Sequence, residues 1–296
     1  MSFLDQVTVL ILTFNEEANI GRTLDALARF PEVVVLDSGS TDATLDIVAR
    51  YPNARWLTRA FDSHAAQWSH GLAACGTGRP WVLALDADYV LPAALVEELA
   101  ALTPDTAACG YRARFRYCIY GRALRGTLYP PVVVLYRRTH ARYVQDGHTQ
   151  RVVVHGAVMP LRARIDHDDR KPLARWLSSQ QRYARLEADH LLSTPARELG
   201  RNARIRRMAW PAPILVFFYT LIAKGCLLDG WAGWLYALQR TIAETMIALE
   251  IIDRRLRQGS ARLAAPSETP ATPREGPAQA PTSTHGIAET SKLCDV

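Results

Sequence analysis

The chain has 296 residues, of which 49% are hydrophobic and seven are Trp, so it is long enough for one or two domains with a substantial core. Its formal net charge of +6 is modest, and no aromatic-rich nucleic-acid motif accompanies the Lys and Arg residues, so no nucleic-acid partner is expected. The five Cys residues form no CxxC pair, which argues against a cysteine-ligated metal site and favours reduced thiols in the cytoplasm.

The first third of the chain alternates between short apolar runs and helical segments. Val7–Leu12 is rich in β-branched residues and predicts a buried first strand. The expected elements that follow are a helix at Asn19–Arg29, a strand at Val33–Leu36, a helix at Ala43–Arg50 capped by Ser40 or Thr41, a strand at Arg55–Leu57, a helix at His64–Ala74 and a strand at Trp81–Leu85. This alternation predicts an α/β fold with a parallel sheet and helices on both faces.

Polar residues follow three of these strands, at Thr13–Glu17, Asp37–Asp42 and Asp86–Asp88. In parallel α/β sheets, ligands bind beyond the carboxyl ends of the strands, where these segments are expected to meet. Asp86 and Asp88 are two carboxylates separated by one small residue, a hard-oxygen pair that suits Mg²⁺ or Mn²⁺. The alternative is that Asp88 caps the helix that begins near Pro92 and that Asp86 is merely solvated.

Two common nucleotide-binding motifs are missing, because the chain has no GxGxxG after its first strand and no GxxxxGK[ST]. The motifs present are TFNEE at Thr13–Glu17, DSGSTD at Asp37–Asp42 and DAD at Asp86–Asp88. In this order and spacing the sequence resembles the family 2 glycosyltransferases of the GT-A fold. Each motif is weak alone, and together they are a specific signal.

The resemblance implies an inverting, metal-dependent hexosyltransferase that uses a nucleotide-sugar donor, expected to be a UDP-sugar, with Mg²⁺ or Mn²⁺ as cofactor. It implies that Asp88 holds the metal directly and that Asp86 contacts the ribose, or the metal through water. It further implies that Asp37 reads the uracil edge. The turn formed by Thr13, Phe14, Asn15 and Glu16 would lie against the nucleotide.

The pattern changes after Asp88. In Tyr111–Cys118, apolar residues alternate with Arg112, Arg114 and Arg116, which predicts a half-buried strand with one cationic face. These arginines either contact phosphate or form a solvated strand face. Val132–Tyr136 predicts another buried strand, and Arg151–His155 and Val158–Ile165 are expected to pair around Gly156. Together these strands would complete a mixed GT-A sheet and form its acceptor side.

Two polar segments, Asp146–Gln150 and Asp166–Lys171, resemble those of the bacterial lipopolysaccharide-core glucosyltransferase group. Many members of that group have His-Glu in the first segment, with the Glu as base, whereas this chain has Thr149 and Gln150 after its histidine. We therefore expect the nearest carboxylate, Asp146, to be the catalytic base, the alternative being a plain β-turn. His167 is expected to be a third ligand beside the metal, or else a strand-end histidine bonded to a neighbouring Asp.

From Pro172 onward the periodicity is helical, with an apolar stripe typical of core packing. An arginine cluster at 201–207 precedes the apolar segment Met208–Leu228, whose uncharged part is short for a membrane span of about 20 residues. This order favours an interfacial or re-entrant element, and a buried core helix is the alternative. A second helix is expected at Leu235–Leu256, and the residues after Ser260 have the composition of a disordered tail.

These patterns predict three parts: a glycosyltransferase domain at 1–170, a helical membrane-associating extension at 171–258 and a tail at 259–296. No signal peptide is visible, so the protein is expected on the cytoplasmic face of the inner membrane, transferring sugar to a saccharide or a lipid-linked acceptor. One alternative is a polyprenyl-phosphate glycosyltransferase. A second alternative is a sugar-1-phosphate nucleotidyltransferase, although the chain lacks the Gly-rich loop that such enzymes usually have after the first strand. A third is a non-catalytic nucleotide-sugar-binding membrane protein.

Overall fold

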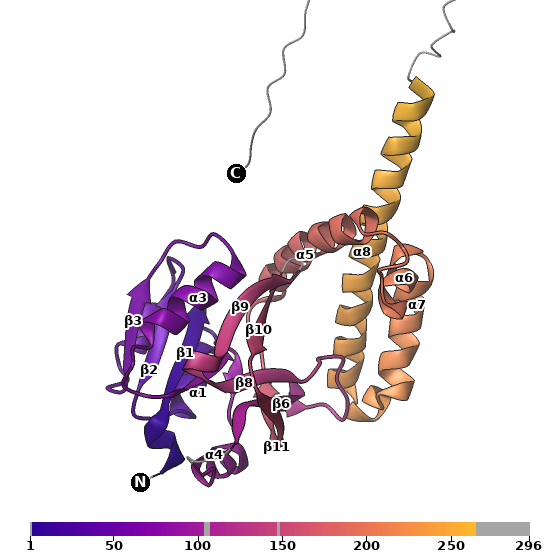
Figure 1. Cartoon of the computed structure of the whole chain (residues 1–296). Helices are drawn as coiled ribbons and strands as arrows, with labels where there is room; N and C mark the ends of the chain where they lie inside the picture. The colour runs from indigo at the N-terminus through magenta and orange to yellow at the C-terminus, as the bar shows by residue number, and fades with distance from the viewer. Residues whose placement is uncertain (1, 104–106, 147–148, 265–296) are drawn as a thin grey trace, which may run out of the picture. The chain divides into compact units, whose positions relative to one another are not determined.

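The computed structural model describes residues 2–103, 107–146 and 149–264, with the backbone alone at 145, 146, 149, 259 and 261–264. Met1–Arg255 forms one compact unit, and a second unit begins at Leu256. Figure 1 shows the chain with its elements labelled. The strands are β1 (Val7–Thr13), β2 (Val33–Asp37), β3 (Ala54–Thr58), β4 (Trp81–Asp86), β5 (Tyr89–Val90), β6 (Ala108–Ile119), β7 (Arg122–Ala123), β8 (Val132–Arg137), β9 (Ala141–Asp146), β10 (Thr149–Val154) and β11 (Ala157–His167).

The helices have the following bounds. The α-helices are α1 (Ile20–Asp25), α2 (Thr44–Val48), α3 (His64–Ala74), α4 (Ala93–Ala100), α5 (Leu173–Ser193), α6 (Arg201–Arg207), α7 (Pro211–Phe218) and α8 (Trp231–Ala264). Four shorter helical segments are η1 (Phe3–Gln6), η2 (Arg138–His140), the π-helix η3 (Tyr219–Ala223) and η4 (Cys226–Asp229). No helix in the described part of the chain combines the length and the apolarity needed to cross a membrane.

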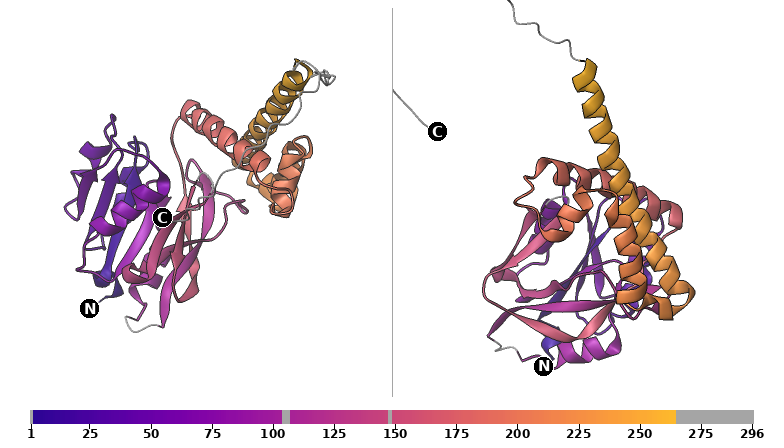
Figure 2. Two further views of the ribbon diagram at one scale, coloured as in Figure 1. Left: turned by 45° about the horizontal axis from the view of Figure 1, so that its top comes forward. Right: turned by 90° about the vertical axis from the view of Figure 1, so that its right-hand side faces the viewer.

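A mixed sheet of nine strands forms the centre of the first unit, in the order β3-β2-β1-β4-β8-β6-β11-β5 with β7 paired to β6. The first four strands are parallel, β8 is antiparallel to β4 and β6, and β11 is parallel to β6. The predicted mixed α/β sheet with flanking helices is therefore confirmed. The views in Figure 2 show the sheet between its helices.

The expected pairing around Gly156 is wrong. Val154 ends β10, which pairs with β9 in a separate hairpin, while β11 joins the main sheet between β6 and β5. Gly156 has φ +122°, and a Cβ there would lie 2.4 Å from Cys109 Sγ. The glycine therefore lets the chain pass from one layer to the next instead of reversing into a hairpin.

The core lies on both faces of the sheet. One cluster packs β1, β2, β4, β6 and β11 against α1, α2, α4 and η1, and a second packs the opposite face against α3 and the β9–β10 hairpin. Within this framework α3 has the predicted bounds, whereas α1 ends at Asp25 and α8 is longer than expected. The expected hydroxyl cap of α2 is also wrong, because Asp42 accepts the Thr44 N–H at 3.0 Å and Ser40 bonds to Asn15 instead.

The C-terminal helices pack on one another and on the sheet. Arg206 of α6 bonds to Glu244 of α8, a side chain only 5% exposed, and lies 3.4 Å from Glu187 of α5. Tyr236 of α8 packs its ring 4.7 Å from that of Tyr117 on β6 and accepts the Leu128 N–H at 3.0 Å. The helical extension is therefore joined to the end of β6.

Gly233, in the first turn of α8, allows the closest of these approaches, since a Cβ there would lie 1.8 Å from the Cys226 carbonyl oxygen. We predict that Gly233→Ala lowers the free energy of unfolding by about 1–3 kcal/mol, because η4 must move away from α8. Chemical denaturation measures the change. The matched control is Gly78→Ala, where a Cβ meets nothing within 4 Å. Equal stability of the two variants would contradict this packing.

Candidate functional site

The loops after β1 and β2 are bonded to each other at the carboxyl edge of the sheet. Asn15 has φ +54°, accepts the Thr41 N–H through its side chain at 2.7 Å, and donates its own N–H to Ser40 Oγ at 2.7 Å. The Glu16 N–H donates to Thr44 Oγ1 at 2.7 Å. These bonds fix the backbone of the first loop against the start of α2.

Asp37 is buried at the end of β2, and its carboxylate is saturated. Oδ1 accepts the hydroxyls of Thr13 at 2.8 Å and Ser40 at 2.5 Å, and Oδ2 accepts the backbone N–H groups of Gly39 and Ser40 at 2.9 and 2.7 Å. A carboxylate offers about four acceptor positions, and all are used here. Contact with a nucleotide base would require one of these bonds to open, and the predicted role of Asp37 in reading uracil stays a prediction.

Asp86 and Asp88 lie at the end of β4, as the sequence indicated. Asp88 does not cap α4, whose N-cap is Pro92; its Oδ2 instead lies 3.0 Å from His167 Nε2 at the end of β11. Burial disfavours the Asp88 carboxylate, but the charge and hydrogen bond of His167 outweigh it and lower the Asp88 pKa. Burial and the Asp88 charge raise the pKa of Asp86.

His167 is enclosed by three tyrosine rings. The centroids of Tyr89, Tyr117 and Tyr129 lie 5.3, 4.8 and 4.9 Å from that of the imidazole. Burial lowers the His167 pKa, but the Asp88 charge and hydrogen bond raise it above its usual value overall. Its Nδ1 is buried and has no hydrogen-bond partner among the described residues. The rings therefore hold the imidazole against Asp88 and keep water from its other side.

Glu16 brings a third carboxylate to this edge. Its Oε1 lies 2.6 Å from Lys171 Nζ, and the Glu16 side chain is 13% exposed. Burial raises the Glu16 pKa from 4.5 to about 7, although the Lys171 charge acts in the opposite direction. The three carboxylates of Glu16, Asp86 and Asp88 thus share two cationic partners, His167 and Lys171. This arrangement leaves an excess of negative charge in a poorly solvated place.

The segment 166–171 runs across the strand ends and bonds to a different element at almost every residue. Asp168 accepts from Arg22 and Arg170 at 2.8 Å each and from the Gly121 N–H at 3.1 Å. Asp169 accepts from Asn19 at 2.8 Å and from the Lys171 N–H at 3.0 Å. Asp168 is therefore bonded through both carboxylate oxygens, which disfavours it as a catalytic base, whereas both bonds of Asp169 fall on its Oδ1.

The structure brings Thr13, Asn15, Glu16, Asp37, Asp86, Asp88 and His167 to one edge of the sheet, and their predicted roles stay predictions. Phe14 is half exposed, with the Arg175 guanidinium 5.8 Å from its ring centroid. Asp146 ends β9, but its side chain lies outside the described residues, so its role stays a prediction. Lys171 was not among the predicted site residues, although it lies in the segment Asp166–Lys171. The available signal was the pair of cations, Arg170 and Lys171, directly after Asp168 and Asp169.

A metal ion would find hard oxygen ligands here. The described residues contain no group of three His, Cys, Asp or Glu side chains arranged to hold a metal. The chemistry of Asp86 and Asp88 nevertheless fits a divalent cation, because His167 is the one cationic side chain that pairs with either of them among the described residues, and Mg²⁺-type ions bind through one or two carboxylates plus substrate phosphates. Metal ligation by Asp86, Asp88 and His167 remains a prediction.

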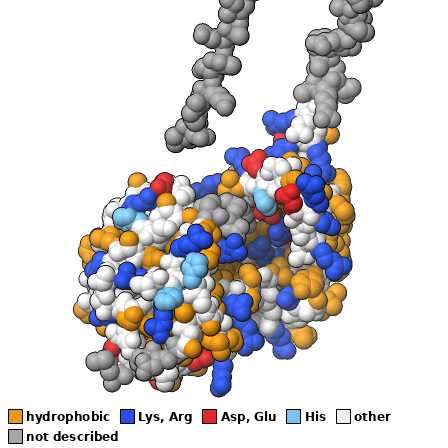
Figure 3. Space-filling view, in the orientation of Figure 1, with side chains coloured by type: hydrophobic (Ala, Val, Ile, Leu, Met, Phe, Trp, Pro, Cys, Tyr) orange, Lys and Arg blue, Asp and Glu red, His pale blue; other side chains and the backbone are white. Residues whose placement is uncertain are grey.

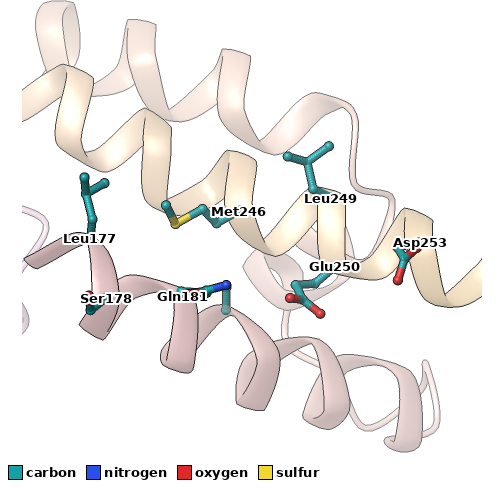
Figure 4. Close-up of a pocket in the computed structure, with 8 residues that line it drawn as sticks. Leu177, Ser178, Gln181, Met246, Leu249, Glu250 and Asp253 are labelled. Atoms are coloured by element: carbon teal, nitrogen blue, oxygen red, sulfur yellow. The ribbon is translucent and has the colours of Figure 1, made fainter. Parts of the chain in front are cut away.

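A separate groove of about 460 Å³ lies between α5 and α8 (Figure 4). Leu177 and Gln181 of α5 face Met246 and Glu250 of α8 across it. Glu250 already accepts from Arg185 and lies 3.6 Å from Arg254, so its charge is balanced. The groove includes none of the residues at the carboxyl edge.

Comparison with known proteins bears on the whole arrangement. The model of glycosyl transferase family 2 matches residues 8–168. The chain is 29% identical over 258 residues to the lipopolysaccharide core biosynthesis glycosyltransferase LpsC of Rhizobium meliloti, covering 84% of this chain and 92% of that protein. It is 33% identical over 95 residues to an uncharacterized glycosyltransferase of Rickettsia typhi, covering 32% of each.

Solved structures give weaker likenesses. S. aureus TarS 1-349 in complex with UDP-GlcNAc has a TM-score of 0.46 at 17% identity, over 86% of this chain and 92% of that one. Glucosyl-3-phosphoglycerate synthase from Mycobacterium tuberculosis, in complex with Mn²⁺, UDP and glucosyl-3-phosphoglycerate, has a TM-score of 0.37 at 18% identity, over 61% and 78%. At these TM-scores neither likeness carries an argument about this chain.

The buried Glu16 generates a prediction about stability. Because its folded pKa is raised from 4.5 to about 7, its contribution to stability is fully present below pH 4.5 and is lost as the pH rises through 7. Glu16→Gln removes this loss. The stability of the variant relative to the natural protein should therefore rise by about 1–3 kcal/mol across that range, as measured by urea unfolding at several pH values. Glu97→Gln, at a side chain 68% exposed, is the control. A parallel pH profile for Glu16→Gln and the natural protein would refute the assignment.

Proposed function

Because the chain belongs to glycosyl transferase family 2, whose model matches more than half of it, we propose that it is an inverting, metal-dependent glycosyltransferase. Its donor is a nucleotide-sugar, proposed to be a UDP-sugar, and its acceptor is a saccharide or lipid-linked saccharide of the cell envelope. The observation that carries the proposal is the group of three carboxylates, Glu16, Asp86 and Asp88, which shares two cationic partners at the carboxyl edge of the sheet. The likeness to LpsC supports an envelope acceptor.

Asp88 would hold the proposed cation, with Asp86 beside it, and the donor diphosphate would supply further oxygen ligands. When bound, it supplies a Lewis acid that neutralises the charge of the departing diphosphate. His167 orients the Asp88 carboxylate through their 3.0 Å contact, and the tyrosine rings around it exclude water. Lys171 keeps Glu16 at this edge and adds a positive charge beside the diphosphate position.

The proposed donor lies against the two bonded loops. Their many backbone hydrogen bonds make this surface rigid before the donor binds, which lowers the entropic cost of positioning it. Phe14, half exposed beside Arg175, offers a ring to the nucleotide. The Asp37 carboxylate accepts its hydrogen bonds from neighbouring groups and so shapes this surface. It would contact the nucleotide base only if one of these hydrogen bonds opened.

The proposed base is Asp146, at the end of β9. A positioned base that takes the acceptor hydroxyl proton contributes about 10²–10⁴-fold to the rate. Another candidate, Asp168, is disfavoured, since both of its oxygens accept bonds, and Asp169 accepts two bonds at Oδ1. The bonds of these other carboxylates support Asp146 as the base, although they do not show where its side chain lies.

The metal assignment predicts the behaviour of Asp88→Asn. Replacing this carboxylate removes the proposed direct ligand of the cation, so turnover of the nucleotide-sugar should fall by at least ~10²-fold. Mn²⁺-dependent UDP binding, measured by calorimetry, should be lost as well. Circular dichroism checks that the variant is folded, and Asp46→Asn, on the exposed side of α2, is the control. Near-normal turnover of Asp88→Asn would rule out Asp88 as the metal ligand.

The helices after Arg207 expose many large apolar side chains, which supports docking on a membrane surface. Trp210 is 75% exposed and Ile222 68%, and Phe217 and Trp234 join α7 to α8 through ring contact at 6.1 Å. The other exposed apolar residues of this surface are Met208, Ile214, Leu215, Phe218, Tyr219, Leu227, Leu228, Trp231 and Leu238. Figure 3 shows hydrophobic side chains along the edge formed by these helices. A monomeric soluble protein seldom exposes an apolar patch of this extent.

We expect this surface to bind the anionic cytoplasmic face of the inner membrane. The arginine cluster at 201–207 directly precedes it in the chain, and each Lys or Arg near such a face adds about 1 kcal/mol to binding. The triple variant Trp210→Ser, Phe218→Ser, Ile222→Ser should lose sedimentation with phosphatidylglycerol vesicles. Trp56→Ser, at a side chain on β3 that is 43% exposed, should not. If the natural protein ignores these vesicles, or the triple variant binds them equally, the surface is an interface between copies of the chain.

A further inference from the structure

A row of arginines occupies one face of the paired strands β6 and β11. Arg112, Arg114 and Arg116 alternate on β6 with the core residues Tyr111, Ala113 and Phe115. On β11, Arg162 and Arg164 alternate with Leu161 and Ile165, which belong to the same core cluster. All five arginines therefore lie on the face opposite that cluster. Arg112, Arg114, Arg162 and Arg164 are exposed.

The row is poorly neutralised. Arg116 donates two bonds of 2.6 Å to Asp166, its register partner on β11. Among the described residues, no carboxylate forms an ion pair with the other four guanidinium groups. Arg114 donates to the Arg162 carbonyl at 3.4 Å, and Glu98 of α4 accepts the backbone N–H of Arg162 at 2.8 Å. Arg114 and Arg164 are themselves register partners. Like charges placed directly opposite each other on neighbouring strands destabilise a sheet, so this face carries a cost that folding alone does not explain.

The row leads toward the catalytic edge. β6 runs parallel to β4, because both are antiparallel to β8, so its carboxyl end lies at the same edge as Asp88. Arg116 and Asp166 directly precede Tyr117 and His167, which belong to the site already described. A strand rises about 3.3 Å per residue, so Arg112 lies roughly 13 Å behind Arg116. The row therefore extends from the site to a distance greater than one sugar ring.

The face containing the row is also the one on which the β9–β10 hairpin packs. A Cβ at Gly110, two residues before Arg112 on β6, would lie 3.4 Å from Val154 of β10. The arginines thus continue along the strand from the layer whose β9 ends at Asp146, the proposed base. This places the row on the side from which an acceptor hydroxyl would approach.

We propose that this row binds an acceptor saccharide bearing phosphate or carboxylate groups several ångströms from the hydroxyl that reacts. The inference rests on the proposed glycosyltransferase function and adds that the acceptor is anionic. Guanidinium groups form paired hydrogen bonds with phosphate and carboxylate, and a row on adjacent strands matches negative groups repeated along an extended chain. The row contains no large apolar side chain to enter a membrane and no exposed aromatic ring to stack on bases.

The test uses the full chain and two saccharide probes with neutral counterparts. Pentamannose phosphate is compared with the same saccharide after phosphatase treatment, and tetragalacturonate with maltotetraose, by calorimetry at low salt. The natural protein should bind one or both charged probes, and Arg114→Gln/Arg164→Gln should weaken that binding at least ~10-fold. The matched control is Arg29→Gln/Arg50→Gln, which removes the same charge beside α1 and α2, on the other face of the sheet. It should bind as the natural protein does.

Hydrolysis of UDP-, GDP- and dTDP-sugars without acceptor separates this inference from the function on which it rests. The arginine variant should keep the hydrolysis rate of the natural protein, because in the described part of the chain neither Arg114 nor Arg164 bonds to the loops after β1 and β2. If no sugar nucleotide is hydrolysed or bound, the proposed function fails. If the donor is used but the charged probes bind no better than the neutral ones, or equally well to the arginine variant, the row is not an acceptor site. Loss of binding to phosphatidylglycerol vesicles alone would make it a membrane contact and would also overturn the inference.

Discussion

The structure depends on how it balances three carboxylates at one poorly solvated edge. Glu16, Asp86 and Asp88 come from the ends of two strands. Within the described part of the chain, His167 and Lys171 are the cations paired with them, and Arg22 adds an electrostatic interaction with Asp88. Burying unpaired charge is costly, so the protein either protonates a carboxylate or admits a cation. The raised pKa values of Glu16 and Asp86 show that burial favours protonation of these two carboxylates. A divalent ion bound together with a diphosphate would offset their charge instead. The same imbalance thus explains both the electrostatics of the free chain and its proposed affinity for a charged donor.

Two kinds of bonding keep this edge in place. The loops after β1 and β2 are held by short local bonds to backbone groups, with Asp37 at their centre, and these bonds leave little freedom to the backbone. The segment 166–171 is held by ion pairs that reach elements far away in sequence, such as Arg22 with Asp168. The helical extension contributes as well, because Tyr236 of α8 packs on Tyr117, which in turn packs on His167. A displacement of α8 would therefore be transmitted to the His167–Asp88 contact through two ring contacts, Tyr236 on Tyr117 and Tyr117 on His167.

Much of this arrangement was predictable from the sequence, because strand ends are where polar residues interrupt apolar runs. Val7–Leu12, Val33–Leu36 and Trp81–Leu85 appear as strands, and the polar residues after them meet at one edge. The sequence indicated less about contacts between distant segments. The pairing of β11 with β6 depends on how Gly156 turns the chain, and a local pattern cannot distinguish that turn from a hairpin. The ion pairs of Lys171 with Glu16 and of Asp168 with Arg22 could not be predicted from local patterns either, because the partners lie some 150 residues apart in sequence.

The central claim is that the carboxylates at this edge bind a divalent cation together with the diphosphate of a nucleotide. Anomalous diffraction from crystals grown with Mn²⁺ and UDP tests it most directly, because manganese is located independently of the protein coordinates. The account predicts one strong peak within about 2.5 Å of an Asp88 oxygen and in contact with the UDP phosphates. UDP bound with no manganese beside Asp88, or manganese bound elsewhere on the chain, would contradict it.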